Sequence, residues 1–135
     1  MRGKNKRVGV ILEGYCNPPD HHEISVAFIL CSFFQSNVRF VPVGDTRAPD
    51  MIIERTGQYW EIKHIRGNGK NTIRHALLSA KGQAENVVIS LLDSKMDAKR
   101  AIGRIKSEIK TISGIKRVIL VTKTGKVVVV FGKVW

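Results

Sequence analysis

Three ionisable residues lie close together in the run PDMIIERTGQYWEIKHI at residues 49–65. Asp50 follows a proline, and Glu61 and Lys63 stand two residues apart among mostly apolar neighbours. Carboxylate oxygens are the ligands that Mg²⁺ and Mn²⁺ prefer in proteins. An ammonium group beside such a metal can hold a water molecule or a phosphate oxygen. These residue types therefore suit metal-assisted hydrolysis of a phosphodiester.

Two strands are expected to position these groups. The runs 50–55 and 58–65 are rich in apolar and β-branched residues, and Thr56-Gly57 between them suits a hairpin turn. Because side chains alternate along a strand, Glu61 and Lys63 share one face with Tyr59, whereas Trp60, Ile62 and His64 share the other.

The length of the turn decides where Asp50 lies. With a two-residue loop, Asp50 pairs with Lys63 and lies diagonal to Glu61, within roughly 7 to 8 Å by backbone position. A turn with an odd number of residues would send Asp50 to the opposite face. Short strings of this kind are most often surface ion pairs. Here the apolar neighbours on both faces favour a central hairpin and a shared acidic patch, with Glu54 as a spare acid nearer the turn.

The rest of the chain predicts a mixed α/β sheet. Asp20 with Glu23 three residues later is typical of a capped helix start, and Asn71 or Thr72 can cap a second helix. The apolar run 86–92 predicts a strand covered on both faces. The expected elements are helix 20–37, strands 38–43, 50–55 and 58–65, helix 71–84, strand 86–92, helix 94–112 and a C-terminal hairpin about Thr124-Gly125.

Size and charge limit the class of protein. The 135 residues suit a basic N-terminal segment over 1–20 and a single domain over 21–135. The 23 Lys and Arg against 11 Asp and Glu leave a net charge of +12, which favours a polyanionic partner such as nucleic acid. Cys16 and Cys31 form no CxxC pair, so neither a zinc site nor a disulfide framework is indicated. No apolar stretch is long enough to span a bilayer.

The order of elements and the two charged motifs resemble the PD-(D/E)xK nuclease superfamily, whose members share an αβββαβ core. The order over residues 21–91 matches that core, with PD at Pro49-Asp50 and EIK at Glu61-Ile62-Lys63. More narrowly, residues 49–92 are similar to nuclease domains at the C-termini of contact-dependent growth inhibition toxins and of some phage or mobile-element proteins.

This resemblance implies a restriction-endonuclease-like fold, with a helix and a C-terminal hairpin after the core, and a metal-dependent endonuclease. It implies that Asp50 and Glu61 hold a divalent metal, Mg²⁺ in the first place and Mn²⁺ or Zn²⁺ as alternatives. Lys63 would orient or activate the attacking water. Glu23 would complete the acid cluster, and Gln83 would position it or touch substrate.

The same resemblance implies a substrate and a partner. The substrate would be DNA or an RNA such as tRNA. The site of action would be cytoplasmic, with delivery from outside the cell, and an immunity protein would be the partner.

Several basic residues are candidate nucleic-acid contacts. The loop 66–71 and the helix start after it offer backbone N–H groups and cations to phosphate, although a solvated loop explains them equally well. The candidates are Lys70, Asn71, Arg74 and Lys81. Tyr59 is suited to stacking on bases, whereas Trp60, on the face away from the acids, is expected in the core.

Two other functions fit the same residues. One is a metal-independent RNase that uses His64 or His75 with Lys63 and Arg74, and its cleavage would survive EDTA. The other is a nucleic-acid-binding module without turnover, in which Glu61→Ala would leave nucleic-acid processing unchanged.

Overall fold

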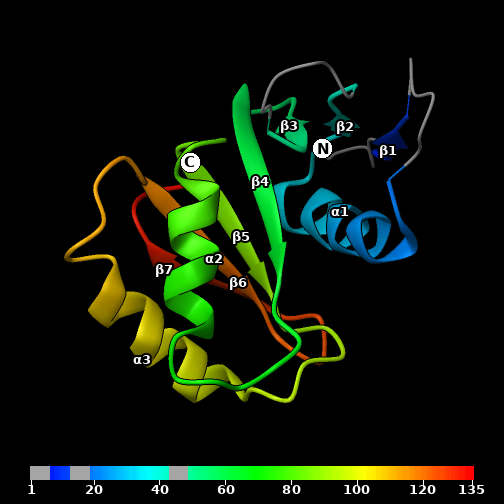
Figure 1. Cartoon of the computed structure of the whole chain (residues 1–135). Helices are drawn as coiled ribbons and strands as arrows, with labels where there is room; N and C mark the ends of the chain where they lie inside the picture. The colour runs from blue at the N-terminus through cyan, green and yellow to red at the C-terminus, as the bar shows by residue number, and fades with distance from the viewer. Residues whose placement is uncertain (1–6, 13–18, 43–48) are drawn as a thin grey trace.

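The computed structural model describes residues 7–12, 19–42 and 49–135. Within these ranges, seven strands form one mixed sheet in the order β1-β2-β3-β4-β5-β6-β7, with three helices packed on it (Figure 1). The elements are β1 (Val10–Ile11), α1 (His21–Phe34), β2 (Val38–Phe40), β3 (Met51–Ile53), β4 (Gln58–His64), α2 (Thr72–Ala80), β5 (Asn86–Ser90), α3 (Ala98–Glu108), β6 (Arg117–Val121) and β7 (Val127–Phe131). The mixed α/β class and the predicted order over 21–91 are confirmed, and β1 is an additional strand.

The sheet changes character at β4. Strands β2, β3 and β4 form an antiparallel meander, whereas β4, β5 and β6 run parallel. Strand β7 returns antiparallel to β6, which confirms the C-terminal hairpin. Parallel strands need crossover connections, and α2 and α3 provide them.

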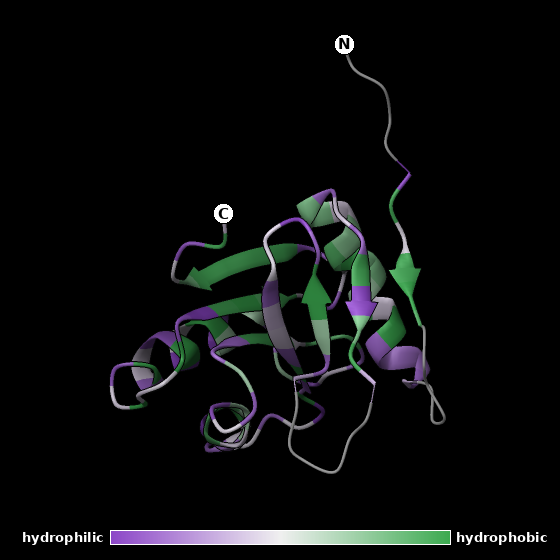
Figure 2. Ribbon diagram, turned by 90° about the horizontal axis from the view of Figure 1, so that it is seen from above, coloured by the Kyte–Doolittle hydropathy of each residue, from purple (hydrophilic) through white to green (hydrophobic). Residues whose placement is uncertain are grey.

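Two apolar clusters, one on each face, hold the helices to the sheet. Helix α1 packs with Trp60 and Val88 on one face, and α2 and α3 pack with Val87 and Ile89 on the other. Every residue of β5 is buried, which confirms the prediction of a strand covered on both faces. Figure 2 shows hydrophobic colour along several strands of the sheet. Trp60 is fully buried, as expected.

Helix ends follow from their caps. The Asp20 carboxylate accepts the Glu23 N–H at 2.8 Å, and the Glu23 carboxylate accepts the Asp20 N–H at 3.1 Å, so the predicted capping box is present. Gln35 adopts the left-handed conformation and ends α1 before the expected Asn37. Helix α2 ends at Ala80, before the expected residue 84, and the Ala80 carbonyl accepts the N–H groups of both Gln83 and Ala84 in the turn that follows.

The turn between β3 and β4 is longer than predicted. Met51 pairs with Trp60 and Ile53 pairs with Gln58, so the turn has four residues, Glu54 to Gly57. The prediction that Asp50 lies opposite Lys63 is therefore wrong by two positions. An even shift keeps the faces unchanged, so this register carries Asp50 toward Glu61.

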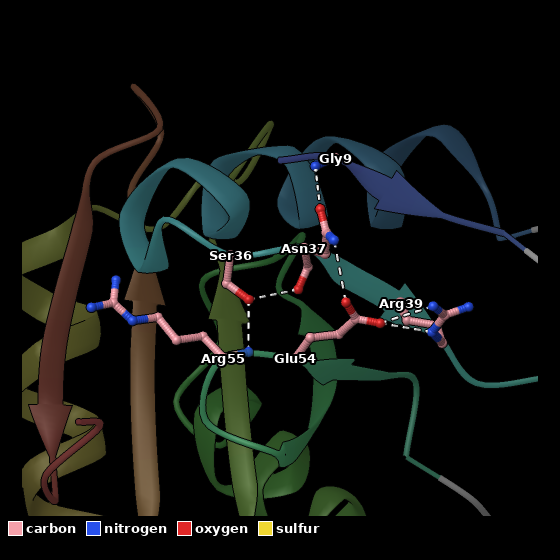
Figure 3. Close-up of polar contacts among 6 residues, drawn as sticks. All are labelled: Gly9, Ser36, Asn37, Arg39, Glu54 and Arg55. Carbon is pink, nitrogen blue, oxygen red and sulfur yellow. Dashed lines mark hydrogen bonds and ion pairs between the residues drawn. The ribbon is translucent and has the colours of Figure 1, made fainter. Parts of the chain in front are cut away.

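A polar cluster anchors the four-residue turn to the end of α1 and to β2 (Figure 3). The Ser36 hydroxyl accepts the Arg55 N–H at 2.8 Å. The Glu54 carboxylate accepts from Asn37 Nδ2 at 3.2 Å and from Arg39 Nε at 2.9 Å. Glu54, the spare acid of the sequence analysis, is thus engaged in the turn.

We predict that Ser36→Ala destabilises the protein by about 1–3 kcal/mol, because the Arg55 N–H loses its acceptor at a buried position. Urea denaturation measures the change. The matched control is Ser107→Ala on the exposed side of α3, which we expect to change the free energy of unfolding by less than about 0.5 kcal/mol. Equal effects in the two variants would contradict the anchoring role of Ser36.

Candidate active site

A pair of carboxyl groups lies where β3 parts from β4. The pairing of β3 begins at Met51, so the Ile62 N–H on β4 has no strand carbonyl to bond there. The Asp50 carboxylate accepts this N–H at 2.7 Å. Asp50 is thereby fixed in the gap, and the register of β3 on β4, extended by one residue, places it opposite Glu61.

Burial makes this pair chemically unusual. Glu61 is only 3% exposed, in the middle of β4. Burial and then the charge of Asp50 raise the pKa of Glu61 to about 8, although Lys63 acts in the opposite direction. Burial also raises the pKa of Asp50, and the Ile62 N–H partly offsets that rise. Two such carboxyl groups are stable together when they share a proton or a cation.

Lys63 completes the site from the same face of β4. Its Nζ lies 3.4 Å from Glu61 Oε2, and it donates to Ser79 Oγ and Gln83 Oε1, each at 3.0 Å. Gln83 is thus beside Lys63. Ser79 was not predicted, because its only sequence signal is a position four residues before Gln83 near the end of α2.

Glu23 lies near this pair but is partly committed elsewhere. One of its oxygens accepts the Asp20 N–H in the capping box. Burial raises the pKa of Glu23, and the charge of Asp50 adds to that rise. Glu23, in the first turn of α1, therefore interacts electrostatically with Asp50.

The donor set fits a divalent cation. Glu61 Oε1 is buried and has no hydrogen-bond partner among the described residues, and a buried oxygen in this state calls for a partner. Two carboxylates with a free buried oxygen suit a hard cation. Among the described residues, no group of three or more His, Cys, Asp or Glu side chains is arranged to hold a metal. Asp50 and Glu61 are thus the two carboxyl groups that could hold a cation here.

The candidate nucleic-acid contacts lie at both ends of α2. Lys70 and Asn71 are exposed before its first turn, and Lys81 is exposed beyond its last. Arg74 NH1 contacts Glu108 Oε1 on α3 at 3.1 Å. Lys81 lies between Ser79 and Gln83 in sequence, so it is the candidate nearest to the two residues that accept from Lys63.

Of the two candidate histidines, His64 lies on the opposite face of the sheet from Lys63. His64 faces the α1 side of the sheet, where its ring lies 3.4 Å from that of His22, centroid to centroid. His64 Nε2 also contacts the Leu92 carbonyl oxygen at 2.6 Å. His75 is exposed on α2.

The fold and site together define a mixed α/β domain with a buried glutamate, a half-buried aspartate beside it and an adjacent lysine. Residues 47–127 match the model of the contact-dependent growth inhibition CdiA C-terminal domain, and because this match covers more than half of the chain, the chain belongs to that family. Membership supports its description as a toxin domain. None of the helices in the described ranges is long and apolar enough to cross a membrane.

A solved structure shares the fold. It is the CdiA-CT/CdiI toxin and immunity complex from Burkholderia pseudomallei, with a TM-score of 0.62, 21% identity and 96% coverage of each chain. At this identity the likeness shows the fold alone. No curated protein matches the chain.

We predict that the carboxylate pair makes stability depend on pH when divalent cations are absent. The pKa of Glu61 is raised from 4.5 to about 8, so the folded state holds a proton that the unfolded state has released. This contribution is complete below about pH 4.5 and is lost as the pH rises through about 8. Urea denaturation in EDTA at several pH values measures it.

The control is Glu61→Gln, which cannot release that proton. The free energy of unfolding of the parent protein should fall relative to that of Glu61→Gln across this pH range. Parallel curves for the two proteins would contradict the assignment of the raised pKa to Glu61.

Proposed function

We propose that the chain is a metal-dependent nuclease of the PD-(D/E)xK type, and that nuclease activity is the basis of its toxicity. The observation that carries the proposal is the pair of half-buried Asp50 and buried Glu61, with Lys63 Nζ 3.4 Å from Glu61 Oε2. The family match gives independent support, because it makes the chain a contact-dependent growth inhibition domain.

Asp50 and Glu61 would hold the cation, for which we propose Mg²⁺ first, with Mn²⁺ or Zn²⁺ as alternatives. When bound, such a cation polarises a phosphoryl oxygen and lowers the pKa of a water molecule. The Ile62 N–H holds Asp50 in place for this task. Glu61 Oε1, buried without a partner among the described residues, is the oxygen that gains most from a cation.

Lys63 would act through its position and charge. An ammonium group has three N–H donors. Lys63 Nζ has three partners within reach, namely Ser79, Gln83 and Glu61. A side chain held in this way is oriented before substrate arrives, so its charge is available to a phosphate without reorganisation. Ser79 lies on the exposed side of α2. If a water molecule replaced the Ser79 hydroxyl as the acceptor for Lys63, Lys63 would orient that water molecule for attack.

The net charge of +12 supports a nucleic-acid substrate, DNA or an RNA such as tRNA, cut endonucleolytically. Lys70, Asn71, Arg74 and Lys81 would contact its phosphates. We also propose delivery from outside and action in the cytoplasm of the target cell. The structural relative is a toxin and immunity complex, which supports an immunity protein as partner.

The position of His64 favours this proposal over a metal-independent RNase that would use His64 with Lys63. Such an enzyme needs its acid, base and cation around one phosphate. His64 lies on the α1 side of β4 and Lys63 on the α2 side. His64 and Lys63 therefore do not face a common space.

We predict that Glu61→Ala abolishes cleavage of nucleic acid and that Lys63→Met lowers the rate by about 10²- to 10³-fold, as expected for loss of one preorganised charge. The measurement is incubation with plasmid DNA and with total RNA, each with EDTA, Mg²⁺, Mn²⁺ or Zn²⁺. The matched control is Asp93→Asn, an exposed acid whose left-handed conformation asparagine also adopts.

Three outcomes decide between the candidate functions. Cleavage that requires a divalent cation and Glu61 supports the metal-dependent nuclease. Cleavage that persists in EDTA would exclude the metal assignment to Asp50 and Glu61. Unaltered nucleic-acid processing by Glu61→Ala, with binding retained, would identify a binding module instead.

A further inference from the structure

Among the described residues, the helices cover only part of the sheet face that carries Glu61 and Lys63. Helices α2 and α3 pack over β4, β5 and β7 (Figure 1), and the apolar cluster beneath them contains no residue of β2 or β3. On this face Arg39, Ile52 and Tyr59 lie directly opposite one another across β2, β3 and β4. None of the three is buried, and Tyr59 is 49% exposed. An exposed aromatic ring thus lies on the same face as the acids.

A cavity of about 450 Å³ lies beside this ring. Its walls include Pro49, Tyr59, Gln83 and Arg117. Pro49 directly precedes Asp50, and Gln83 is the residue that accepts from Lys63 at 3.0 Å. The cavity therefore adjoins the candidate active site, and its volume is in the range of small-ligand pockets.

The spacing of Tyr59 and Glu61 matches one nucleotide. The two residues are two positions apart on one strand, which separates them by about 7 Å along β4. A base stacked on Tyr59 would place the phosphodiester beside it at Glu61 and Lys63. The base would thus lie at Tyr59 and the scissile phosphate at Glu61 and Lys63, on the same face of β4.

The charges around the cavity tolerate a nucleotide. Arg117 donates to Asn86 Oδ1 at 3.0 Å and to the Lys133 carbonyl oxygen at 2.6 Å, so a fixed cation lies in the wall. Glu85 is the acid at this rim, and Lys116 Nζ lies 2.8 Å from it. The local field therefore does not exclude a phosphate.

Resting on the proposed nuclease function, we propose that Tyr59 is the stacking platform for one unpaired base of the substrate, which the adjoining cavity receives next to the scissile phosphodiester. Stacking on an aromatic ring accepts any base. A base inside a duplex has both faces covered by its neighbours, so it must first leave the stack. The site therefore selects single-stranded or extruded nucleotides.

Tyr59→Ala tests this proposal. Binding is measured in EDTA, where cleavage is not required, with a short single-stranded oligonucleotide and with the same sequence as a duplex. We expect Tyr59→Ala to weaken single-strand affinity by about 5- to 150-fold, the loss of one base stack, and to leave duplex affinity unchanged. Tyr59→Phe, which keeps the ring, should bind within about twofold of the parent protein.

Phe28→Ala is the matched control. Phe28 is 57% exposed on α1, at the opposite face of the sheet, and its loss should change neither affinity. An abasic site can be placed at each position of the single strand in turn. At one position, removal of the base should weaken binding by the parent protein but should not weaken binding by Tyr59→Ala any further. Such non-additivity identifies the base that stacks on Tyr59.

The outcomes separate this proposal from the nuclease function. Equal single-strand affinity in Tyr59→Ala and the parent protein, or a parent protein that binds no single strand, would overturn the stacking platform, whether or not cleavage occurs. Tyr59-dependent binding without cleavage in any metal would support the platform and contradict the nuclease.

Discussion

Asp50 accepts the Ile62 N–H at 2.7 Å at the point where β3 and β4 part, and this bond holds the site together. Strand β4 is flanked by an antiparallel and a parallel neighbour, so its N–H groups are used by the ladder almost throughout. The gap in the ladder before Met51 leaves one N–H for a side chain, and the aspartate that accepts it lies beside a buried glutamate. The unfavourable contact of two carboxyl groups is offset by this N–H and by Lys63.

Elements distant in sequence maintain that geometry. The cluster of Ser36, Asn37 and Arg39 holds the turn at Glu54 and Arg55, and the turn sets the register of β3 on β4. Helix α2 and the turn after it supply the Ser79 and Gln83 acceptors for Lys63. The site is therefore assembled from strand, turn and helix ends, and a change in any of them would move a charged group out of reach.

The two faces of the sheet differ in how completely the helices cover them. On the α1 side, Trp60, Phe34 and their neighbours form a closed core, and His64 is stacked on His22. On the α2 side, the helices cover only part of the sheet, so Glu61 is buried while Tyr59, two residues before it, is exposed. Burial raises the pKa values of Asp50 and Glu61, and in the proposed function the exposed surface at Tyr59 would give a polyanion access to them.

Alternation along β4 and the capping residues of α1 were sufficient to predict the element order, the shared face of Glu61 and Lys63, and the place of Trp60 in the core. These features depend on local periodicity and local hydrogen bonds, which a sequence displays directly. The turn length, the bond from Ile62 to Asp50, the Ser79 contact and the engagement of Glu54 with Arg39 were decided by the tertiary structure. Each of them depends on which distant groups remain unpaired after the sheet has formed, and only the complete packing of the chain determines that.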